Sequence, residues 1–478
     1  MRQRINFCGP TFEARDGRIN DQVAVNMYPR PTGPQARAPV VLYSLPGLKY
    51  RQTVGVGPHR GKPIKFGTSW FTVSRGEFYE VSSSGVATVR GTLNTTSGRI
   101  KMVKNFSTQI LVIDGTYGYI WNGTTLTQIA DPDFPANPID CAYLDSYFIV
   151  VAGGTNNFYI SDLENGTSWV ATEYGVTQQR ADNLKAISTA TGDVWLPGEE
   201  SLEIWTNTGN ATFPFQVIKG LLFDYGTLAT HSIEALDANP IWLSNTPFGG
   251  NIIVTGVGRQ PKILSDDDLN WQLSQLTRTD DAVAMVYYQA GVPFYILTFP
   301  TDGVTYGLDI QTGWWHKRES PDGGAWEPAG LIFYGNEHIA VSSVDGNVYT
   351  LDFDTHTDNA QNRRRLRRAA VLEDRGLKTA HNSLEVLCSV GVGTMTGEGV
   401  NPQAVLRYSD DGGSTWSHDL PQPLGVQGAR DTRLIWDQLG DTYGRIYELR
   451  CDHPVEFNII DAWLDWERAD GVQTKGKR

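Results

Sequence analysis

Residues 110–121 read ILVIDGTYGYIW, which is a short apolar strand, a turn with Asp and Gly, and a second strand of aromatic and β-branched residues. Such a stretch predicts a β-hairpin. The pattern occurs seven times, beginning at residues 70, 110, 148, 194, 241, 294 and 338. Successive copies therefore begin 40, 38, 46, 47, 53 and 44 residues apart. This period is typical of four-stranded propeller blades in which each hairpin supplies the two middle strands.

The seven hairpins predict a β-propeller over residues 55–355. We expect seven blades, or six if one hairpin is an insertion. A helical repeat of the same length would space its apolar residues 3.6 positions apart and contain few glycines. This chain has 50 Gly among 478 residues, which favours strands joined by tight turns.

The segment between the fifth and sixth hairpins departs from this pattern. Ser265 is a suitable helix N-cap, and three aspartates follow it. Negative charge in the first turn stabilises a helix, so we expect an inserted helix near residues 265–285. Asp266, Asp267 and Asp268 could also bind a cation, although the role at a helix N-terminus is favoured.

The rest of the chain completes an all-β plan of a propeller followed by an antiparallel β-sandwich. Residues 1–54 are expected to form an N-terminal arm and the strand that leads into the propeller. Residues 356–382 are polar and lack strand alternation, which indicates a charged linker or an exposed helix. Strand patterns resume over residues 383–467, where we expect the sandwich. Residues 468–478 are expected to form a flexible tail.

The predicted sandwich contains YSDDGGSTWS at residues 408–417. This stretch fits the Asp-box pattern found in sialidases and other propeller enzymes. The residues of the box are Ser409, Asp411, Gly413, Thr415 and Trp416. The box is either a stabilised turn or the remnant of an enzyme. Because it lies away from the catalytic carboxylates even in sialidases, and is single here and outside the propeller, we favour the turn.

As a turn, the Asp box has a definite expected geometry. Asp411 should accept hydrogen bonds from turn amides, and Gly413 should adopt a positive φ. Trp416 should pack on the sandwich core, against strand residues such as Val405 or Leu464.

A run of arginines is the strongest charge anomaly, since the chain as a whole has a formal net charge of −13. Its members are Arg363, Arg364, Arg365, Arg367 and Arg368. Three interpretations are open: a solvated linker, contact with an acidic neighbouring subunit, or contact with DNA. In an acidic chain a second copy is a natural partner, because arginine pairs well with carboxylates.

No motif in the sequence indicates catalysis, a cofactor or a metal. GVGPHRGKP at residues 55–63 resembles a phosphate loop, but Val56 replaces the first required Gly and Pro63 replaces the Ser or Thr. The histidines form no HExxH or HxH pair, and GxSxG does not occur. A sialidase would need three arginines, a tyrosine and carboxylates converging on the propeller axis. We therefore expect a protein that is not an enzyme and has no cofactor or metal site.

Cysteine usage and hydropathy add two expectations. Cys8, Cys141, Cys388 and Cys451 form no CxxC pair, so reduced and buried thiols are expected. The N-terminal residues lack the apolar segment of a signal peptide, and no run of eighteen apolar residues occurs. We therefore expect no membrane span.

Five segments, taken in order, resemble the packaged-DNA stabilisation, or tail-hub (nozzle), proteins of short-tailed phages of the Salmonella podovirus type. They are VAVNMYPRP (23–31), YSLPGLKY (43–50), YISDLENGTSW (159–169), SLEIWTNTGNATFPFQVIKGLLFDYGTLA (201–229) and the paired strands with two tryptophans at 294–320. The resemblance runs from residue 23 to about residue 465. The Asp box and the arginine run do not map onto the family, so neither inherits a role from it.

The resemblance implies a structural protein of the virion tail. It implies a homo-oligomeric ring, expected to be a hexamer, below the portal and the adaptor (head-completion) protein. Such a ring closes the DNA channel, stabilises packaged DNA, which passes without sequence-specific binding, and carries tail fibres or spikes and the tail tip. Assembly would take place in the host cytoplasm. The alternatives are a glycan-binding receptor module and a sialidase-like hydrolase.

Overall fold

The computed structural model describes residues 2–106, 108–210 and 212–469, and it divides into two units. Unit 1 comprises Met1–Lys49, Val304–Ala325 and Asp352–Arg478, and unit 2 comprises Tyr50–Gly303 and Trp326–Leu351. The division falls within strands β6 (Gly47–Thr53) and β32 (Asn347–Asp352). The predicted flexible tail begins where β41 ends, and residues 470–478 lie outside the described residues.

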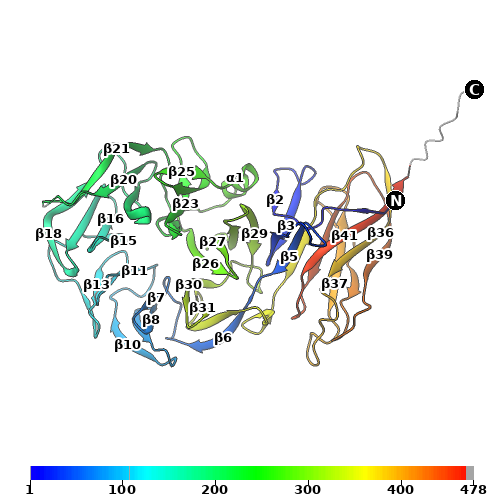
Figure 1. The fold of residues 1–478 in the computed structure, drawn as a ribbon, viewed down its shortest axis with the longest axis horizontal. Coiled ribbons are helices and arrows are strands. Elements are labelled where there is room, and N and C mark those ends of the chain that lie inside the picture. The colour runs from blue at the N-terminus through cyan, green and yellow to red at the C-terminus, as the bar shows by residue number, and fades with distance from the viewer. Residues whose placement is uncertain (1, 107, 211, 470–478) are drawn as a thin grey trace, which may run out of the picture. The chain divides into compact units, whose positions relative to one another are not determined.

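Unit 2 is built from successive groups of antiparallel strands (Figure 1). The first three groups are β7 (Ile64–Phe66), β8 (Ser69–Ser74), β9 (Glu77–Val81) and β10 (Ala87–Thr92); β11 (Lys101–Lys104), β12 (Ile110–Ile113), β13 (Gly118–Trp121) and β14 (Leu126–Gln128); and β15 (Pro138–Leu144), β16 (Tyr147–Ala152), β17 (Asn157–Asp162) and β18 (Asn165–Val176). The next two are β19 (Asp193–Pro197), β20 (Leu202–Asn207) and β21 (Phe215–Phe223); and β22 (Glu234–Leu236), β23 (Asn239–Asn245), β24 (Asn251–Val257) and β25 (Gln260–Ile263). The last two are β26 (Val283–Gln289) with β27 (Val292–Phe299), and β30 (Pro328–Tyr334) with β31 (Glu337–Ser342) and β32.

The first strands of neighbouring groups lie against one another around an axis. β7 lies against β11 and β11 against β15, while β22 lies against β26, β26 against β30, and β30 against β7. This arrangement is a β-propeller, as the sequence predicts. Six of the seven predicted hairpins have strands that pair within unit 2. In the remaining hairpin, which begins at residue 294, β27 belongs to unit 2 and β28 (Val304–Asp309) belongs to unit 1.

The apolar pattern of the hairpins has a simple cause, because each blade buries both of its faces. In β12, Ile110 and Val112 pack in a core shared with Phe71 and Phe78 of the preceding blade. Leu111 and Ile113 point the other way, into the core shared with the following blade. A strand covered on both faces is apolar at every position rather than at alternate positions, and each fully buried aliphatic side chain contributes about 1.5–3 kcal/mol.

The predicted inserted helix exists, but it is shorter and begins differently. α1 spans Asp267–Ser274, and its N-cap is Asp266, whose side chain accepts a hydrogen bond from Leu269 N at 2.8 Å. The predicted N-cap, Ser265, is wrong, since its hydroxyl accepts from Ile253 N at 2.9 Å. The described residues of unit 2 also contain the short 3-10 helices η1 (Ala190–Gly192) and η2 (Thr230–Ser232).

Unit 1 is a β-sandwich whose strands come from both ends of the chain. One sheet has the order β39 (Leu434–Thr442), β36 (Thr379–Cys388), β41 (Ile459–Arg468), β5 (Val40–Ser44) and β4 (Met27–Pro31), with β1 (Arg2–Arg4) also on β41. The other contains β28, β29 (Trp314–Arg318), β3 (Asp21–Val25), β35 (Arg365–Arg368), β40 (Ile446–Cys451), β37 (Gln403–Ser409) and β38 (Leu420–Pro423), with β2 (Phe12–Glu13) on β3. One core, which includes Leu42, Leu384, Leu406 and Leu449, joins the two sheets.

The prediction of a charged linker over residues 356–382 is wrong. The segment contains β33 (Thr357–Asp358), β34 (Gln361–Asn362) and β35, and β35 is paired on both sides, with β3 and with β40. The predicted N-terminal arm likewise contributes strands β1–β5 to the sandwich. Strand alternation was not visible in the linker sequence because buried positions of β35 are occupied by arginine.

Candidate functional site

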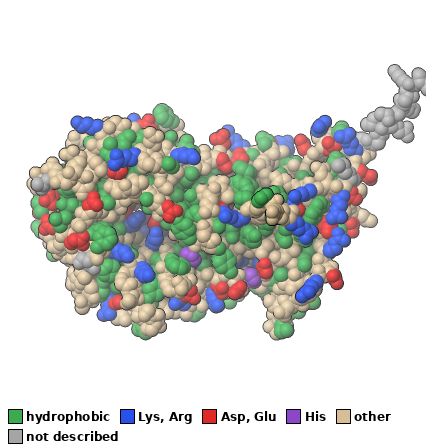
Figure 2. Space-filling model, in the orientation of Figure 1, with side chains coloured by type: hydrophobic (Ala, Val, Ile, Leu, Met, Phe, Trp, Pro, Cys, Tyr) green, Lys and Arg blue, Asp and Glu red, His purple; other side chains and the backbone are tan. Residues whose placement is uncertain are grey.

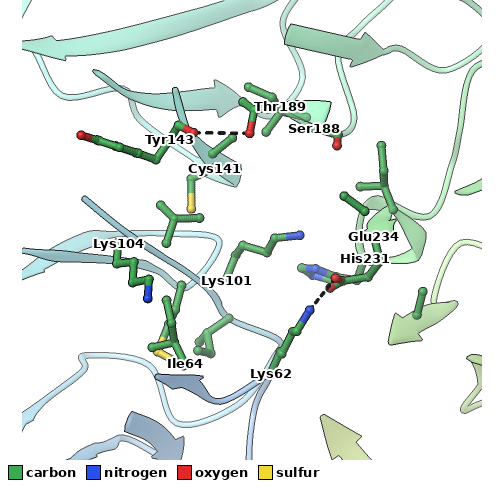
Figure 3. Close-up of a pocket in the computed structure, with 18 of the residues that line it drawn as sticks. Lys62, Ile64, Lys101, Lys104, Cys141, Tyr143, Ser188, Thr189, His231 and Glu234 are labelled. Atoms are coloured by element: carbon green, nitrogen blue, oxygen red, sulfur yellow. Dashed lines mark hydrogen bonds and ion pairs between the residues drawn. The ribbon is translucent and has the colours of Figure 1, made fainter. Parts of the chain in front are cut away.

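A cavity of about 530 Å³ lies at the axis of the propeller, among the first strands of its blades. Figure 2 shows Lys and Arg side chains inside this hollow. Its charged and reactive lining residues come from the segments before β7 and β11, from β11 itself, from β15 and from η2 with β22. They are Lys62, Arg99, Lys101, Lys104, Cys141, Tyr143, His231 and Glu234. In Figure 3, Lys62 and Lys101 extend toward His231 and Glu234 across the cavity.

The basic side chains of the cavity have unequal partners. Lys62 Nζ lies 2.7 Å from Glu234 Oε2, and Lys101 Nζ lies 3.7 Å from Asp140 Oδ1. Arg99 donates from Nη2 to the backbone oxygen of Ala329 at 2.9 Å. Lys104 Nζ donates to the carbonyl of Lys65, also at 2.9 Å. Two of the four cations thus face a carboxylate, and two contact neutral carbonyls.

Two carboxylates stabilise this cluster. Asp140 is fully buried and accepts hydrogen bonds from the backbone amides of Cys141 and Ile187, each at 2.9 Å. Burial raises the pKa of Asp140, although Lys101 and these amides favour its charged form. Burial alone would also raise the pKa of Glu234, but Lys62, Lys101 and Arg99 together lower it below its usual value. Glu234 is therefore ionised at neutral pH.

The remaining titratable groups of the cavity are neutral at pH 7. Burial, and then the charges of Arg99 and Lys101, lower the pKa of His231 to about 3. Burial raises the pKa of the Cys141 thiol well above its usual value. A thiol that remains protonated is a weak nucleophile, and a neutral imidazole beside cations is a poor site for a proton. The cavity is therefore suited to holding negative charge rather than to activating a nucleophile.

The sialidase-like arrangement considered from the sequence is not found at this cavity. Among the described residues that line it, Arg99 is the one arginine, whereas that chemistry needs three. The hydroxyl of Tyr143 donates to Glu164 Oε1. No sequence motif indicates this cavity, and the signal that the sequence does contain is RIKMVK at residues 99–104, which places three cations on and just before one blade's first strand.

The arginine run lies within and beside β35, and three of its members are buried. Arg363, Arg365 and Arg367 have relative exposures of 1%, 0% and 0%. Arg363 donates to the carbonyls of Leu45 and Pro46 and forms an ion pair with Asp358 at 3.3 Å. These buried side chains therefore stabilise the fold of unit 1, and the interpretation as a solvated linker is wrong for them.

The other two buried arginines also hold distant backbone segments. Arg365 donates to the carbonyls of His453 and Val455. Arg367 donates to Phe7 O at 2.7 Å, to Pro10 O at 3.1 Å and to Gln22 Oε1 at 2.5 Å. Burial lowers the pKa of Arg367 to about 10, so it is still charged at neutral pH.

The outer members of the run differ from the buried three. Arg364 has a side chain that is 45% exposed and donates to both carboxylate oxygens of Glu319, at 2.8 and 2.7 Å. Arg368 is partly buried between Asp21 and Glu448, at 2.6 and 2.9 Å. Contact of the run with another subunit or with DNA stays a prediction, and Arg364 has the most side-chain surface to offer.

The Asp box forms the turn that follows β37. Ser409 donates to Asp411 Oδ1 at 2.7 Å, and Asp411 accepts from the amide and the hydroxyl of Thr415 at 2.8 and 2.6 Å. These hydrogen bonds, first those from Thr415 and then that from Ser409, lower the pKa of Asp411 to about 2. Gly413 has a φ of 90°, which favours glycine.

The expected packing of Trp416 is wrong. Its ring lies 4.9 Å from the guanidinium carbon of Arg368 and 4.7 Å from that of Arg407, and it is only partly buried. Glu448, with a fully buried side chain, holds both arginines, accepting from Arg407 at 2.5 Å. The Asp box and the arginine run are thus one structure, in which Trp416 packs on cations and does not belong to the apolar core that contains Leu464.

Two further findings concern metals and thiols. Among the described residues, no group of three or more His, Cys, Asp or Glu side chains is placed to hold a metal ion. The three aspartates at residues 266–268 cap α1 and occupy its first turn. Cys8, Cys141, Cys388 and Cys451 are free and buried, and burial raises the pKa of Cys388 to about 12. Within the described part of the chain, no helix has the length and hydropathy needed to cross a bilayer.

Two family models match the chain in succession. The model described as bacteriophage P22 Gp10, β-propeller, matches residues 9–356, and the model described as bacteriophage P22 Gp10, β-sandwich, matches residues 343–467. No curated protein sequence matches the chain. The two matches together extend over both folds described above and over nearly the whole sequence.

Solved structures show more distant similarity. A virginiamycin B lyase from Staphylococcus aureus is 10% identical, with 63% of this chain and 98% of that chain covered at a TM-score of 0.44. The computationally designed Ika8 protein is 11% identical, with coverages of 69% and 99% and a TM-score of 0.37. The N-terminal domain of Nup159 is 9% identical, with coverages of 65% and 95% and a TM-score of 0.40. Similarity at this level carries no functional argument.

Proposed function

We propose that this chain, which belongs to the bacteriophage P22 Gp10 family, forms the hub, or nozzle, ring of a phage tail. The family is one of phage structural proteins, so the chain is a component of the virion. The proposed ring contains six copies below the portal and the adaptor. It closes the DNA channel after packaging and carries the tail fibres or spikes and the tail tip.

The observation that supports this proposal is the coverage of the whole architecture by one family. The propeller match and the sandwich match adjoin in the same chain, over residues 9–467. A propeller and a sandwich with strands from both chain ends are rigid building blocks. Closed rings arise when identical rigid copies make head-to-tail contacts through two different surfaces.

The charge of the chain supports the proposed relation to DNA. With 53 acidic and 40 basic residues, the chain has a net charge of −13. Binding to DNA requires clustered cations on a surface, and three of the five clustered arginines are buried. A channel formed by such subunits would repel phosphate and let DNA pass without sequence-specific binding.

Exposed apolar side chains in turns of the propeller are candidate contacts for other tail proteins. Phe248, between β23 and β24, is 88% exposed, and Val344, between β31 and β32, is 71% exposed. Phe106, after β11, is 91% exposed. Large apolar groups at this exposure gain stability when a partner covers them.

The test is to produce phage particles without this protein. Heads should package DNA and then lose it, which leaves empty heads without finished tails, and supplying the wild-type protein should restore both. Negative-stain images of the purified protein should show rings with a central channel. Full heads that retain DNA in the absence of the protein would contradict the proposal.

A further inference from the structure

The axial cavity of the propeller contains more positive than negative charge. The described residues that line it include four cations, Lys62, Arg99, Lys101 and Lys104, and one carboxylate, Glu234. Asp140, which lies beside Lys101, adds a second negative charge. Arg99 and Lys101 are partly buried, and the surrounding protein screens their excess positive charge less than water does, so a counter-charge at the cavity is favourable.

The positions of these cations favour one kind of ligand. Lys62 and Lys101 approach Glu234 from across the cavity, and Lys104 projects from the same strand as Lys101 (Figure 3). The Arg99 guanidinium has a neutral carbonyl as its partner at 2.9 Å, so its charge is not neutralised there. Guanidinium and ammonium groups around one space are the usual recognition groups for phosphate and carboxylate oxygens.

We propose that this cavity binds a small, multiply charged oxyanion, of the phosphate or polycarboxylate class, through Arg99, Lys101 and Lys104, with Lys62 at its side. The cavity, at about 530 Å³, has the volume of on the order of 15 to 20 water molecules and falls within the usual size of ligand sites. It is therefore large enough for an anion with several charged groups. This proposal is independent of the ring and goes beyond the tail role.

The neutral groups of the cavity agree with an anionic ligand. Burial, with Arg99 and Lys101, holds the pKa of His231 at about 3, so the imidazole is uncharged and acts as a hydrogen-bonding group. The lining also includes apolar residues, among them Ile64 and Ile233, which screen the charge of the cations less than water does. An anion in such a surrounding is held more strongly than at an open surface.

The test uses the purified full-length protein and isothermal titration calorimetry at constant ionic strength. The two probes are tripolyphosphate and tricarballylate, with sodium chloride as the reference. Arg99→Gln and Lys101→Gln should each weaken binding by about tenfold or more, since each removes a charged donor. Lys104→Gln, at an exposed side chain that does not threaten folding, should weaken it by a smaller factor. Lys262→Gln, at an exposed lysine of β25, is the matched control and should bind like the wild type.

The outcomes separate the ligand classes and test the site itself. Binding of tripolyphosphate alone identifies a phosphate site, whereas binding of both probes identifies a site for oxyanions in general. No binding of either probe overturns the proposal. Binding that is weakened equally by Lys262→Gln and Lys104→Gln also overturns it, because the effect is then the loss of overall charge.

Discussion

Both units contain cationic side chains that are buried or partly buried, but they neutralise them differently. In unit 1, Arg363, Arg365 and Arg367 donate to backbone carbonyls from segments that are far away in the sequence. In unit 2, Arg99 and Lys101 line a cavity in which carboxylates balance only part of the positive charge. Arginines surrounded by carbonyls hold a fold together, while cations around a cavity can accept a ligand. The same residue type thus has a structural role in one unit and a proposed binding role in the other.

The sharpest test of this contrast is Arg367→Met. The substitution leaves Phe7 O, Pro10 O and Gln22 Oε1 without their donor, in a place where Arg367 is fully buried. We expect the free energy of unfolding of unit 1 to fall by about 3–5 kcal/mol, since each buried acceptor that loses its partner costs about 1–3 kcal/mol. Urea unfolding of the full chain, with hydrogen exchange to locate the transition in unit 1, measures the change.

The matched control is Arg364→Met in the same run. The Arg364 side chain is 45% exposed, and its ion pair with Glu319 is at the surface. Arg364→Met should therefore lower the free energy of unfolding by less than about 1 kcal/mol. Equal effects of the two substitutions would show that burial of the arginines does not distinguish them.

The second test concerns Trp416, which lies between the two kinds of environment. Replacing a tryptophan of an apolar core by alanine would lower the free energy of unfolding by about 3–5 kcal/mol. Trp416 instead contacts the guanidinium groups of Arg368 and Arg407. We expect Trp416→Ala to lower the free energy of unfolding of unit 1 by about 1–2 kcal/mol, which is the range for cation–π contacts that are partly shielded from water.

Trp436 provides the control for Trp416, because it is 4% exposed and belongs to the apolar core of the sandwich. Trp436→Ala should therefore destabilise unit 1 by about 3–5 kcal/mol in the same unfolding experiment. A double-mutant cycle of Trp416→Ala with Arg407→Gln should give a measurable coupling energy. If Trp416→Ala costs as much as Trp436→Ala, the cation–π assignment is wrong.

The difference between the hairpins and the arginine run explains what could be predicted from sequence. A blade hairpin such as residues 110–121 contains its own turn and its own strands, so local residues are sufficient to predict it. The role of Arg367 depends on Phe7, Pro10 and Gln22, about 350 positions earlier. Sequence shows the cations but not their acceptors, so it does not distinguish a solvated run from buried arginines.

The axial cavity was missed for a related reason. The cations of RIKMVK lie on β11 and just before it, and only closure of the propeller brings Lys62, Glu234 and His231 to face them. Trp416 was misplaced because a tryptophan in a predicted sandwich suggests an apolar core, while the sequence does not show that Glu448 holds two arginines beside it. Contacts that are local in sequence were predictable, and contacts set by tertiary structure were not.

The third test concerns the cavity cations and should have a small effect on stability. Arg99→Gln removes the hydrogen bond to O of the buried Ala329 and the attraction to Glu234, but it also removes repulsion between cations. We expect the free energy of unfolding to fall by no more than about 1–2 kcal/mol, because the relieved repulsion offsets part of the lost interactions. The pKa of His231 should rise above about 3 while remaining below its usual value, because burial is the main cause of its shift and Arg99 is secondary. NMR titration of the imidazole measures this shift, and an unchanged pKa would show that Arg99 does not act on the cavity.

The last test uses pH to examine the Asp-box turn, where the expected effect is smallest. Hydrogen bonds from Thr415 and Ser409 lower the pKa of Asp411 to about 2, below its usual value of 3.8. A carboxyl group whose pKa is lower in the folded state stabilises the fold above its unfolded pKa. The stabilising contribution of Asp411 is therefore fully present at neutral pH, and it is lost as the pH falls from about 4 to about 2. Asp411→Asn should therefore lower the melting temperature slightly at pH 7, and the difference from the wild type should shrink as the pH falls below 4.

Thermal unfolding at a series of pH values measures this difference in melting temperature, with Asp419→Asn, at a surface ion pair with Arg450, as the control. A difference that stays constant down to pH 2 would mean that Asp411 acts through its shape rather than through its charge.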